Sequence, residues 1–246
     1  MKRVSREHVI FEMNKDNEPV LTAVSGETVV FETQDCFSGE VQSEADTVSD
    51  IDFTTVNPAT GPLYVSGAEV GDTLKVTINR IAVDNKGAVL TPPGLGLLSD
   101  GIGTEETAIA EVTDTATLYK GYEIPLRKMV GVIGTAPAGE GINTGTPDDH
   151  GGNLDTILLG EGATLYLPVN VEGALLAMGD LHSSMGDGEI MGSGLEVAGE
   201  IEVLVEVVKD SDLPLPFIET DELYRGWALP CGLWGAGHRH RLAAFG

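Results

Sequence analysis

The chain has 246 residues, of which 39 are acidic and 14 are basic, so its formal net charge is -25. This charge argues against nucleic acid and anionic membrane surfaces as partners, because both are bound through basic patches. The sequence has no run of 18 apolar residues and no apolar signal core near its N-terminus, which predicts a cytoplasmic protein. The two cysteines, Cys36 and Cys231, do not make a disulfide framework.

Frequent glycine, proline and β-branched residues predict many short strands joined by tight turns. Residues 1–35 alternate apolar and polar positions, which predicts two or three antiparallel strands. Longer alternating runs predict strands over residues 73–81 and 196–208, the second with acids on its outer face. The segment 85–87, Asn-Lys-Gly, is typical of a hairpin end. No helix of appreciable length is expected before residue 209.

A polar stretch between two apolar runs concentrates the chemistry of the chain. Residues 179–189 read Gly-Asp-Leu-His-Ser-Ser-Met-Gly-Asp-Gly-Glu. Alternate residues of an extended segment point to the same side, so Asp180 and His182 are expected to converge on one centre. After the intervening bend, Asp187 and Glu189 are expected to do the same.

A second polar stretch, residues 144–155, has a similar composition. It carries Asp148, Asp149, His150, Asn153 and Asp155 around a Gly-Gly pair that lets the backbone approach a ligand closely. Asp and Asn beside glycine also bond to backbone groups in ordinary turns, and for either stretch alone this explanation is as good as a functional one. Two stretches that each hold a histidine and at least two carboxylates favour a functional site.

Residues 225–246 contain both tryptophans, two of the five histidines and no acid, which sets them apart in so acidic a chain. We therefore predict a β-rich region over residues 1–224, of one or two interleaved subdomains, and an atypical tail over residues 225–246. The histidines in the sequence His238-Arg-His240 are assigned to this tail rather than to a metal site.

Six segments occur together and in a fixed order along the chain. They are Asp35-Cys-Phe-Ser-Gly, 57–72, 131–137, His150-Gly-Gly-Asn-Leu-Asp155, 167–174 and 179–189. With these segments the chain resembles the acetamidase/formamidase family of amide hydrolases over roughly residues 1–224. The resemblance implies a mainly β fold, with a β-sandwich-like part, a barrel-like part and a reduced C-terminal α/β portion. It also implies a homo-oligomer that hydrolyses small amides, such as acetamide or formamide, to the acid and ammonia.

Amide hydrolysis needs a nucleophile, stabilisation of an oxyanion and a proton for the departing ammonia. The chain has no GxSxG elbow, and its carboxylates and histidines favour water activated by a metal ion. We expect a divalent cation, zinc before calcium, bound by Asp155, Asp180 and His182. Either Asp35 or His150 would complete the site.

In this hypothesis Glu189 takes the proton from water and returns it to nitrogen, while Asn153 and the amides of residues 151–152 stabilise the oxyanion. Two alternatives remain open. Cys36 is either a small buried residue or the nucleophile of a different amidase, activated by His150 or His182. A calcium-dependent carbohydrate-binding β module without catalysis would also explain acidic loops.

Overall fold

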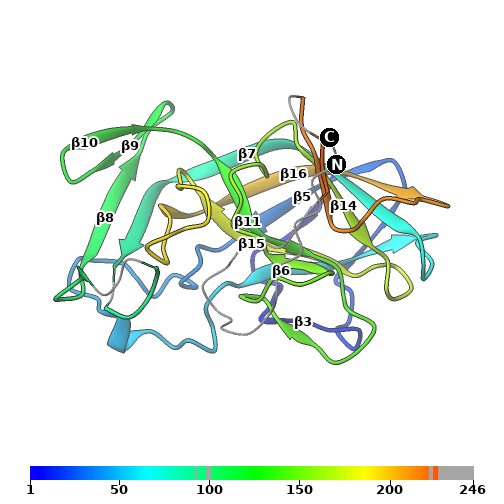
Figure 1. Cartoon of the computed structure of the whole chain (residues 1–246), viewed down its shortest axis with the longest axis horizontal. Coiled ribbons are helices and arrows are strands. Elements are labelled where there is room, and N and C mark those ends of the chain that lie inside the picture. Colours follow the sequence, from blue (N-terminus) through cyan, green and yellow to red (C-terminus); the bar gives the residue numbers. More distant parts are fainter. Residues whose placement is uncertain (92, 98–100, 222–223, 227–246) are drawn as a thin grey trace.

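The computed structural model describes residues 1–91, 93–97, 101–221 and 224–226 (Figure 1). Of the described residues, 45% are in β-strands and 2% are helical, so the prediction of a mainly β protein is confirmed. The described residues contain one turn of 3-10 helix, Val48–Asp50, and no α-helix. None of their helices is long and apolar enough to cross a membrane. From residue 227 onward the predicted tail, including Cys231, lies outside this description.

The strands follow one another along the chain with short connections. They are β1 (Lys2–Val4), β2 (Val9–Ile10), β3 (Glu12–Met13), β4 (Leu21–Val24), β5 (Glu27–Thr33), β6 (Ala59–Ser66), β7 (Thr73–Leu90), β8 (Thr107–Val112), β9 (Ala116–Tyr119), β10 (Tyr122–Pro125), β11 (Met129–Gly134), β12 (Ile142–Asn143), β13 (Gly151–Asn153), β14 (Thr164–Pro168), β15 (Leu176–His182), β16 (Glu196–Val208), β17 (Phe217–Glu219) and β18 (Tyr224–Gly226). All except β3 and β12, which pair with each other, belong to one large sheet.

The long antiparallel pair β7 and β16 forms the spine of this sheet, and Figure 1 shows the two strands side by side. Strand β7 pairs with β14 along its first residues and with β8 along its last. Strand β16 pairs with β15 at its first two residues and with β5 from Gly199 onward. These pairings branch without forming a closed ring among the described strands, so the part expected to be barrel-like is an open, branched sheet.

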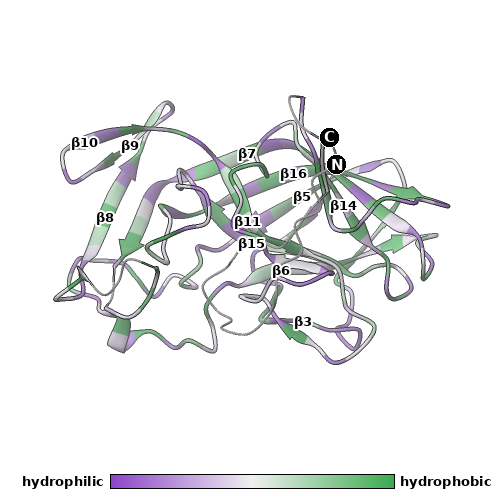
Figure 2. Ribbon diagram, in the orientation of Figure 1, coloured by the Kyte–Doolittle hydropathy of each residue, from purple (hydrophilic) through white to green (hydrophobic). Residues whose placement is uncertain are grey.

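The core is built from strands in which apolar and polar residues alternate. Figure 2 shows this alternation as changes of hydropathy along β7. On β16 the side chains of Val197, Ile201, Val203 and Val205 are fully buried, while those of Glu200, Glu202 and Glu206 are partly exposed. This is the pattern expected of a strand with one buried face. The branched strands thereby enclose one large apolar core, which gives the fold its sandwich-like part.

One segment differs from the sequence prediction, and the difference shapes the site. The expected hairpin end at residues 85–87 lies inside β7, which continues to Leu90. A Cβ at Gly87 would lie 2.9 Å from the carbonyl oxygen of Glu196, so glycine there allows β16 to start close to β7. The first residues of the polar stretch 179–189, through His182, are extended as expected and belong to β15.

Candidate active site

Neighbouring strands bring five titratable side chains to one place. Strand β11 pairs with β13 on one side and β15 on the other, and the end of β15 pairs with the start of β16. Asp155 follows β13, Asp180 and His182 lie on β15, and Glu196 begins β16 directly opposite His182. Glu189 comes from the loop between β15 and β16.

The imidazole of His182 is the centre of this cluster. Its Nε2 lies 2.9 Å from Glu196 Oε2, 3.4 Å from Asp180 Oδ1 and 3.6 Å from Glu189 Oε1. Asp180 and His182 therefore converge as their alternate spacing predicts. The side chain of His182 is 0% exposed, whereas that of Glu189 is 17% exposed. Glu189 is thus the carboxylate of the His182 cluster with the best access to solvent.

Several atoms of the cluster are buried without a hydrogen-bond partner among the described residues. They are Asp155 Oδ1, Asp180 Oδ1, Glu196 Oε2 and both ring nitrogens of His182. Buried polar atoms are nearly always paired, because leaving one unpaired costs its full desolvation energy. The 2.9 Å approach between His182 and Glu196 lacks the geometry of a hydrogen bond. A cation among these atoms would supply the missing partner.

The donor set fits a divalent metal ion. One oxygen of Asp155, one nitrogen of His182 and one oxygen of Glu189 lie within 4.8 Å of one another. Zinc is bound by histidine nitrogen and carboxylate oxygen, whereas calcium takes oxygen ligands. The presence of an imidazole at the centre of the carboxylates therefore favours zinc.

Three acids of the cluster have an unusual backbone conformation. Asp155, Asp180 and Glu189 have φ angles of 38°, 55° and 45°, in the left-handed region that disfavours side chains. Such residues cost roughly 1–3 kcal/mol each and gather at functional sites, where the surrounding structure holds them in place. The local strain at Asp180 is notable because this residue lies inside a strand.

Burial and mutual repulsion change the protonation of the cluster. Burial and the neighbouring Asp180 raise the pKa of Asp155 to about 8. Burial, followed by Asp155, raises the pKa of Glu189 well above its usual value, and burial also raises the pKa of Glu196. Burial lowers the pKa of His182, but the carboxylates of Glu196 and Asp180 outweigh it and raise this pKa well above 6.5. Without a cation, the cluster therefore retains protons at neutral pH.

Strand β11 passes directly beside two of the acids, and Gly131 makes this possible. A Cβ at Gly131 would contact the carboxylate of Asp180 and would lie 2.9 Å from Asp155 Oδ1. The same Cβ would lie 2.8 Å from the carbonyl oxygen of Asp180. Glycine at this position is therefore required by the packing of the site.

Gly131→Ala is expected to displace Asp155 and Asp180 and to weaken zinc binding by about 10- to 100-fold, as changes to groups that support metal ligands do. Isothermal titration calorimetry with zinc measures the affinity. Gly139→Ala is the matched control, because a Cβ at Gly139 meets no atom within 4 Å. Equal zinc affinity in both variants would contradict the close packing of β11 against the acids.

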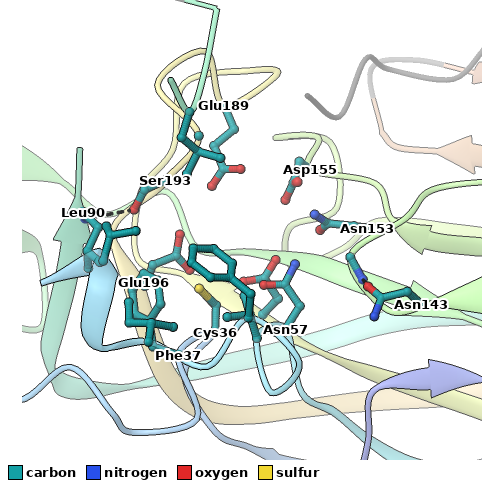
Figure 3. Close-up of a pocket in the computed structure, with 18 of the residues that line it drawn as sticks. Cys36, Phe37, Asn57, Leu90, Asn143, Asn153, Asp155, Glu189, Ser193 and Glu196 are labelled. Atoms are coloured by element: carbon teal, nitrogen blue, oxygen red, sulfur yellow. Dashed lines mark hydrogen bonds between the residues drawn. The ribbon is translucent and has the colours of Figure 1, made fainter. Parts of the chain in front are cut away.

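A pocket of about 180 Å³ opens beside the cluster. Its polar wall carries the carboxylates together with Asn153, as Figure 3 shows for Asn153, Asp155, Glu189 and Glu196. Apolar side chains form another part of the wall, from Phe37, Val48, Ile51, Phe53, Val56, Leu90 and Leu95. This arrangement suits a small molecule with one polar group and one apolar group.

Two of the predicted site residues, Asp35 and Asp187, accept hydrogen bonds from backbone N–H groups and do not join the cluster around His182. Asp35 Oδ1 accepts hydrogen bonds from the backbone N–H groups of Phe37 at 2.9 Å and Gly39 at 3.0 Å, and Asp35 does not line the pocket. Burial raises the pKa of Asp35 despite these hydrogen bonds. Asp187 is exposed, and its Oδ1 accepts a hydrogen bond from the backbone N–H of Ile157 at 3.3 Å. Asp187 therefore does not converge with Glu189.

The site residues predicted from the second polar stretch differ in whether they line the pocket. Asn153 lines the pocket, and its buried Oδ1 has no hydrogen-bond partner in the described ranges. His150 is 2% exposed and does not line the pocket. Burial lowers the pKa of His150 to about 4, so this imidazole is neutral. The backbone N–H of Gly151 donates to the carbonyl oxygen of Asp148 at 2.9 Å, so it is not available to an oxyanion.

Glu196 was missed by the sequence prediction. It lies an even number of residues from Glu200, Glu202 and Glu206, so the strand pattern predicts that it shares their face. Those three acids are partly exposed, whereas Glu196 is 2% exposed. No local pattern separates it from those acids. Only the pairing of β16 with β15 turns it from a solvated acid into a neighbour of His182.

Cys36 lines the pocket, with its sulfur near the carboxylate of Glu196 (Figure 3). Burial, Glu196 and Asp180 raise the pKa of Cys36 well above its ordinary value. The reactive form of cysteine is the thiolate, so a protonated thiol among carboxylates is a poor nucleophile. This environment disfavours the alternative in which Cys36 attacks the amide.

Comparisons with known proteins agree with this fold. The model of the acetamidase/formamidase family matches residues 5–144 and 138–223. A formamidase of Methylophilus methylotrophus is 29% identical over 253 residues, covering 78% of this chain, and the chain spans 62% of the length of that curated relative. The crystal structure of an acetamidase from Bacillus halodurans superposes with a TM-score of 0.88 at 50% identity, over 89% of this chain and 75% of that chain.

An acetamidase from Yersinia enterocolitica gives a TM-score of 0.84 at 29% identity, over 89% of this chain and 72% of that chain. The family match extends over nearly all of the described residues. It includes every residue of the cluster around His182. The chain belongs to the acetamidase/formamidase family.

Proposed function

We propose that the chain hydrolyses the C–N bond of short linear amides, acetamide or formamide, to the carboxylate and ammonia. The family to which the chain belongs supports this reaction. The observation that carries the proposal is the buried His182, surrounded by carboxylate oxygens, beside a pocket of about 180 Å³. A pocket of this size accepts a small amide and leaves room for water.

The cluster would hold a divalent cation through Asp155, Asp180 and His182. The unpartnered atoms of these three side chains support this assignment. When bound, such an ion polarises a carbonyl oxygen and makes water a better nucleophile near neutral pH. Zinc is proposed before calcium because of the imidazole ligand.

Glu189 would move the proton. It is the most exposed carboxylate around His182, and it lines the pocket. Burial raises its pKa toward the range in which a carboxylate both accepts and releases a proton. Glu189 takes a proton from the attacking water at a carboxylate oxygen and delivers it to the amide nitrogen, which then leaves as ammonia.

Two further parts of the pocket would act on the substrate. The amide group of Asn153 lies in the polar wall, where its N–H donors can stabilise negative charge on the substrate oxygen. The apolar wall around Ile51 and Leu90 would pack against the acyl group and exclude water from it.

Release of ammonia from acetamide and formamide tests the proposal directly. The chain is expected to release ammonia, to lose this activity after exhaustive chelation, and to regain it when zinc is added. Far-ultraviolet circular dichroism shows whether the chelated chain remains folded. Activity that survives complete removal of metal but is lost in Cys36→Ala would overturn the metal proposal. A folded, zinc-loaded chain that cleaves no short amide would overturn the amidase proposal and favour a binding module.

A further inference from the structure

The pocket beside the cluster around His182 has more apolar wall than a very small amide can use. Seven of its lining side chains are apolar, among them Ile51, Phe53 and Leu90. Formamide has no carbon atom beyond its carbonyl, and acetamide has a single methyl group. Apolar lining stabilises a ligand by burying the apolar surface of that ligand. The extent of this wall therefore indicates an acyl group larger than acetyl.

The volume of the pocket leads to the same conclusion. It is about 180 Å³. A dry apolar cavity of about 150 Å³ binds benzene, which has six non-hydrogen atoms, and a water molecule takes up about 30 Å³ in the liquid. The pocket therefore has room for about six non-hydrogen atoms together with the attacking water. Acetamide has only four such atoms, whereas butanamide has six.

Hydrogen bonds to neighbouring strands hold the apolar wall in place. Residues 37–56, between β5 and β6, supply five of its seven side chains. The Nζ of Lys86 on β7 donates to the carbonyl oxygen of Gln42 at 2.8 Å. The hydroxyl of Thr107 on β8 donates to the carbonyl oxygen of Asp46 at 2.6 Å. A wall that is already built needs little ordering when a ligand binds, so its apolar contacts count nearly in full.

The wall also continues from the interior to the surface of the molecule. Ile51 and Leu90 belong to a small buried core, on which Val56 packs. Phe53 lines the same pocket but is half-exposed. An acyl chain too long for the interior of the pocket would therefore extend toward the ring of Phe53.

We propose that the apolar wall is an acyl-binding site, and that the chain prefers linear amides with acyl groups of four to six carbon atoms over formamide and acetamide. This inference rests on the proposed amide hydrolysis. Burial of one methylene group strengthens binding about fourfold, so kcat/KM is expected to rise about 15-fold from acetamide to butanamide. The increase should level off toward hexanamide, because its last carbons reach the half-exposed Phe53.

The test is a series of amides of increasing length. Ammonia release from formamide, acetamide, butanamide and hexanamide gives kcat/KM for the zinc-loaded chain. Val56→Phe places a ring where the acyl chain would lie, so it should lower the ratio of kcat/KM for butanamide to that for acetamide to about one or below. The matched control is Val70→Phe, because Val70 is exposed and does not line the pocket. It should keep the ratio of the unaltered chain.

The outcomes separate this inference from the function on which it rests. Acetamide cleaved with kcat/KM equal to or above that of butanamide and hexanamide would overturn the acyl-binding site and leave the amidase proposal standing. An unchanged ratio in a folded Val56→Phe would also overturn it. If the folded chain cleaves no amide, the amidase proposal fails, and calorimetry with the same amides tests the wall alone. Butanamide should then bind more tightly than acetamide, and equal affinities would overturn the inference.

Discussion

Replacing Glu189 with glutamine is expected to lower kcat for acetamide by about 10²- to 10⁴-fold, the usual contribution of a general acid–base group. Glutamine has nearly the same shape as glutamate but cannot accept a proton from water. Glu189 is 17% exposed and its Oε1 lies 3.6 Å from His182 Nε2, so it reaches both the pocket and the cluster around His182. Steady-state kinetics with acetamide, together with zinc content, measure the effect.

The matched control is Asp187→Asn, two residues earlier in the same loop. Asp187 is exposed, so its substitution is expected to change kcat by less than about twofold, the range of ordinary surface substitutions. The zinc content of Glu189→Gln should equal that of the unaltered chain. If Glu189→Gln loses zinc in proportion to activity, Glu189 is a ligand alongside Asp155 and His182 instead of the proton carrier.

Removal of metal is expected to make the stability of the chain fall as pH rises from about 4 to 8. The pKa of Asp155 is about 8 in the folded state against 3.8 for an ordinary aspartate, so unfolding releases its proton throughout this range. A folded state that binds more protons than the unfolded state loses stability with rising pH. The raised pKa of His182 acts in the same direction, because its protonation stabilises the fold below pH 6.5 and is lost as pH passes its folded value.

The expected loss is several kcal/mol, since one pKa unit corresponds to about 1.4 kcal/mol and several groups contribute. Thermal unfolding of the chelated chain at pH 5 and pH 8 measures it as a lower Tm at the higher pH. The zinc-loaded chain should show a much smaller change, because the cation favours the ionised carboxylates. Asp155→Asn should reduce the pH dependence of the metal-free chain. A metal-free chain whose Tm rises over this range would contradict the raised pKa values.

The site lies where β16 changes partners, and this position explains its composition. The first residues of β16 pair with β15, and later residues pair with β5. Beside this change of partners, side chains from β15, from the turn after β5 and from β16 itself meet. Buried charges at this position cost stability. Binding of a metal ion would offset that cost.

The sequence by itself predicted the features that depend on neighbouring residues. Strict alternation over residues 196–208 is a local pattern, and it correctly placed Val203 and Val205 in the core. The alternate spacing of Asp180 and His182 likewise predicted that they converge, and their side chains lie 3.4 Å apart. The composition of the two polar stretches singled out Asp155, Asp180, His182 and Glu189, which the structure brings close together.

Only the tertiary structure identified Glu196 and Gly131 as parts of the site. Glu196 resembles the outward acids of its strand, and Gly131 resembles any glycine in an apolar run. Their roles come from pairing between segments that are remote in sequence, as in the register that sets Glu196 opposite His182. The same holds for Asp35, whose carboxylate caps a turn instead of facing the cluster. Alternation is a property of a few adjacent residues, whereas strand register is decided by the packing of the whole sheet.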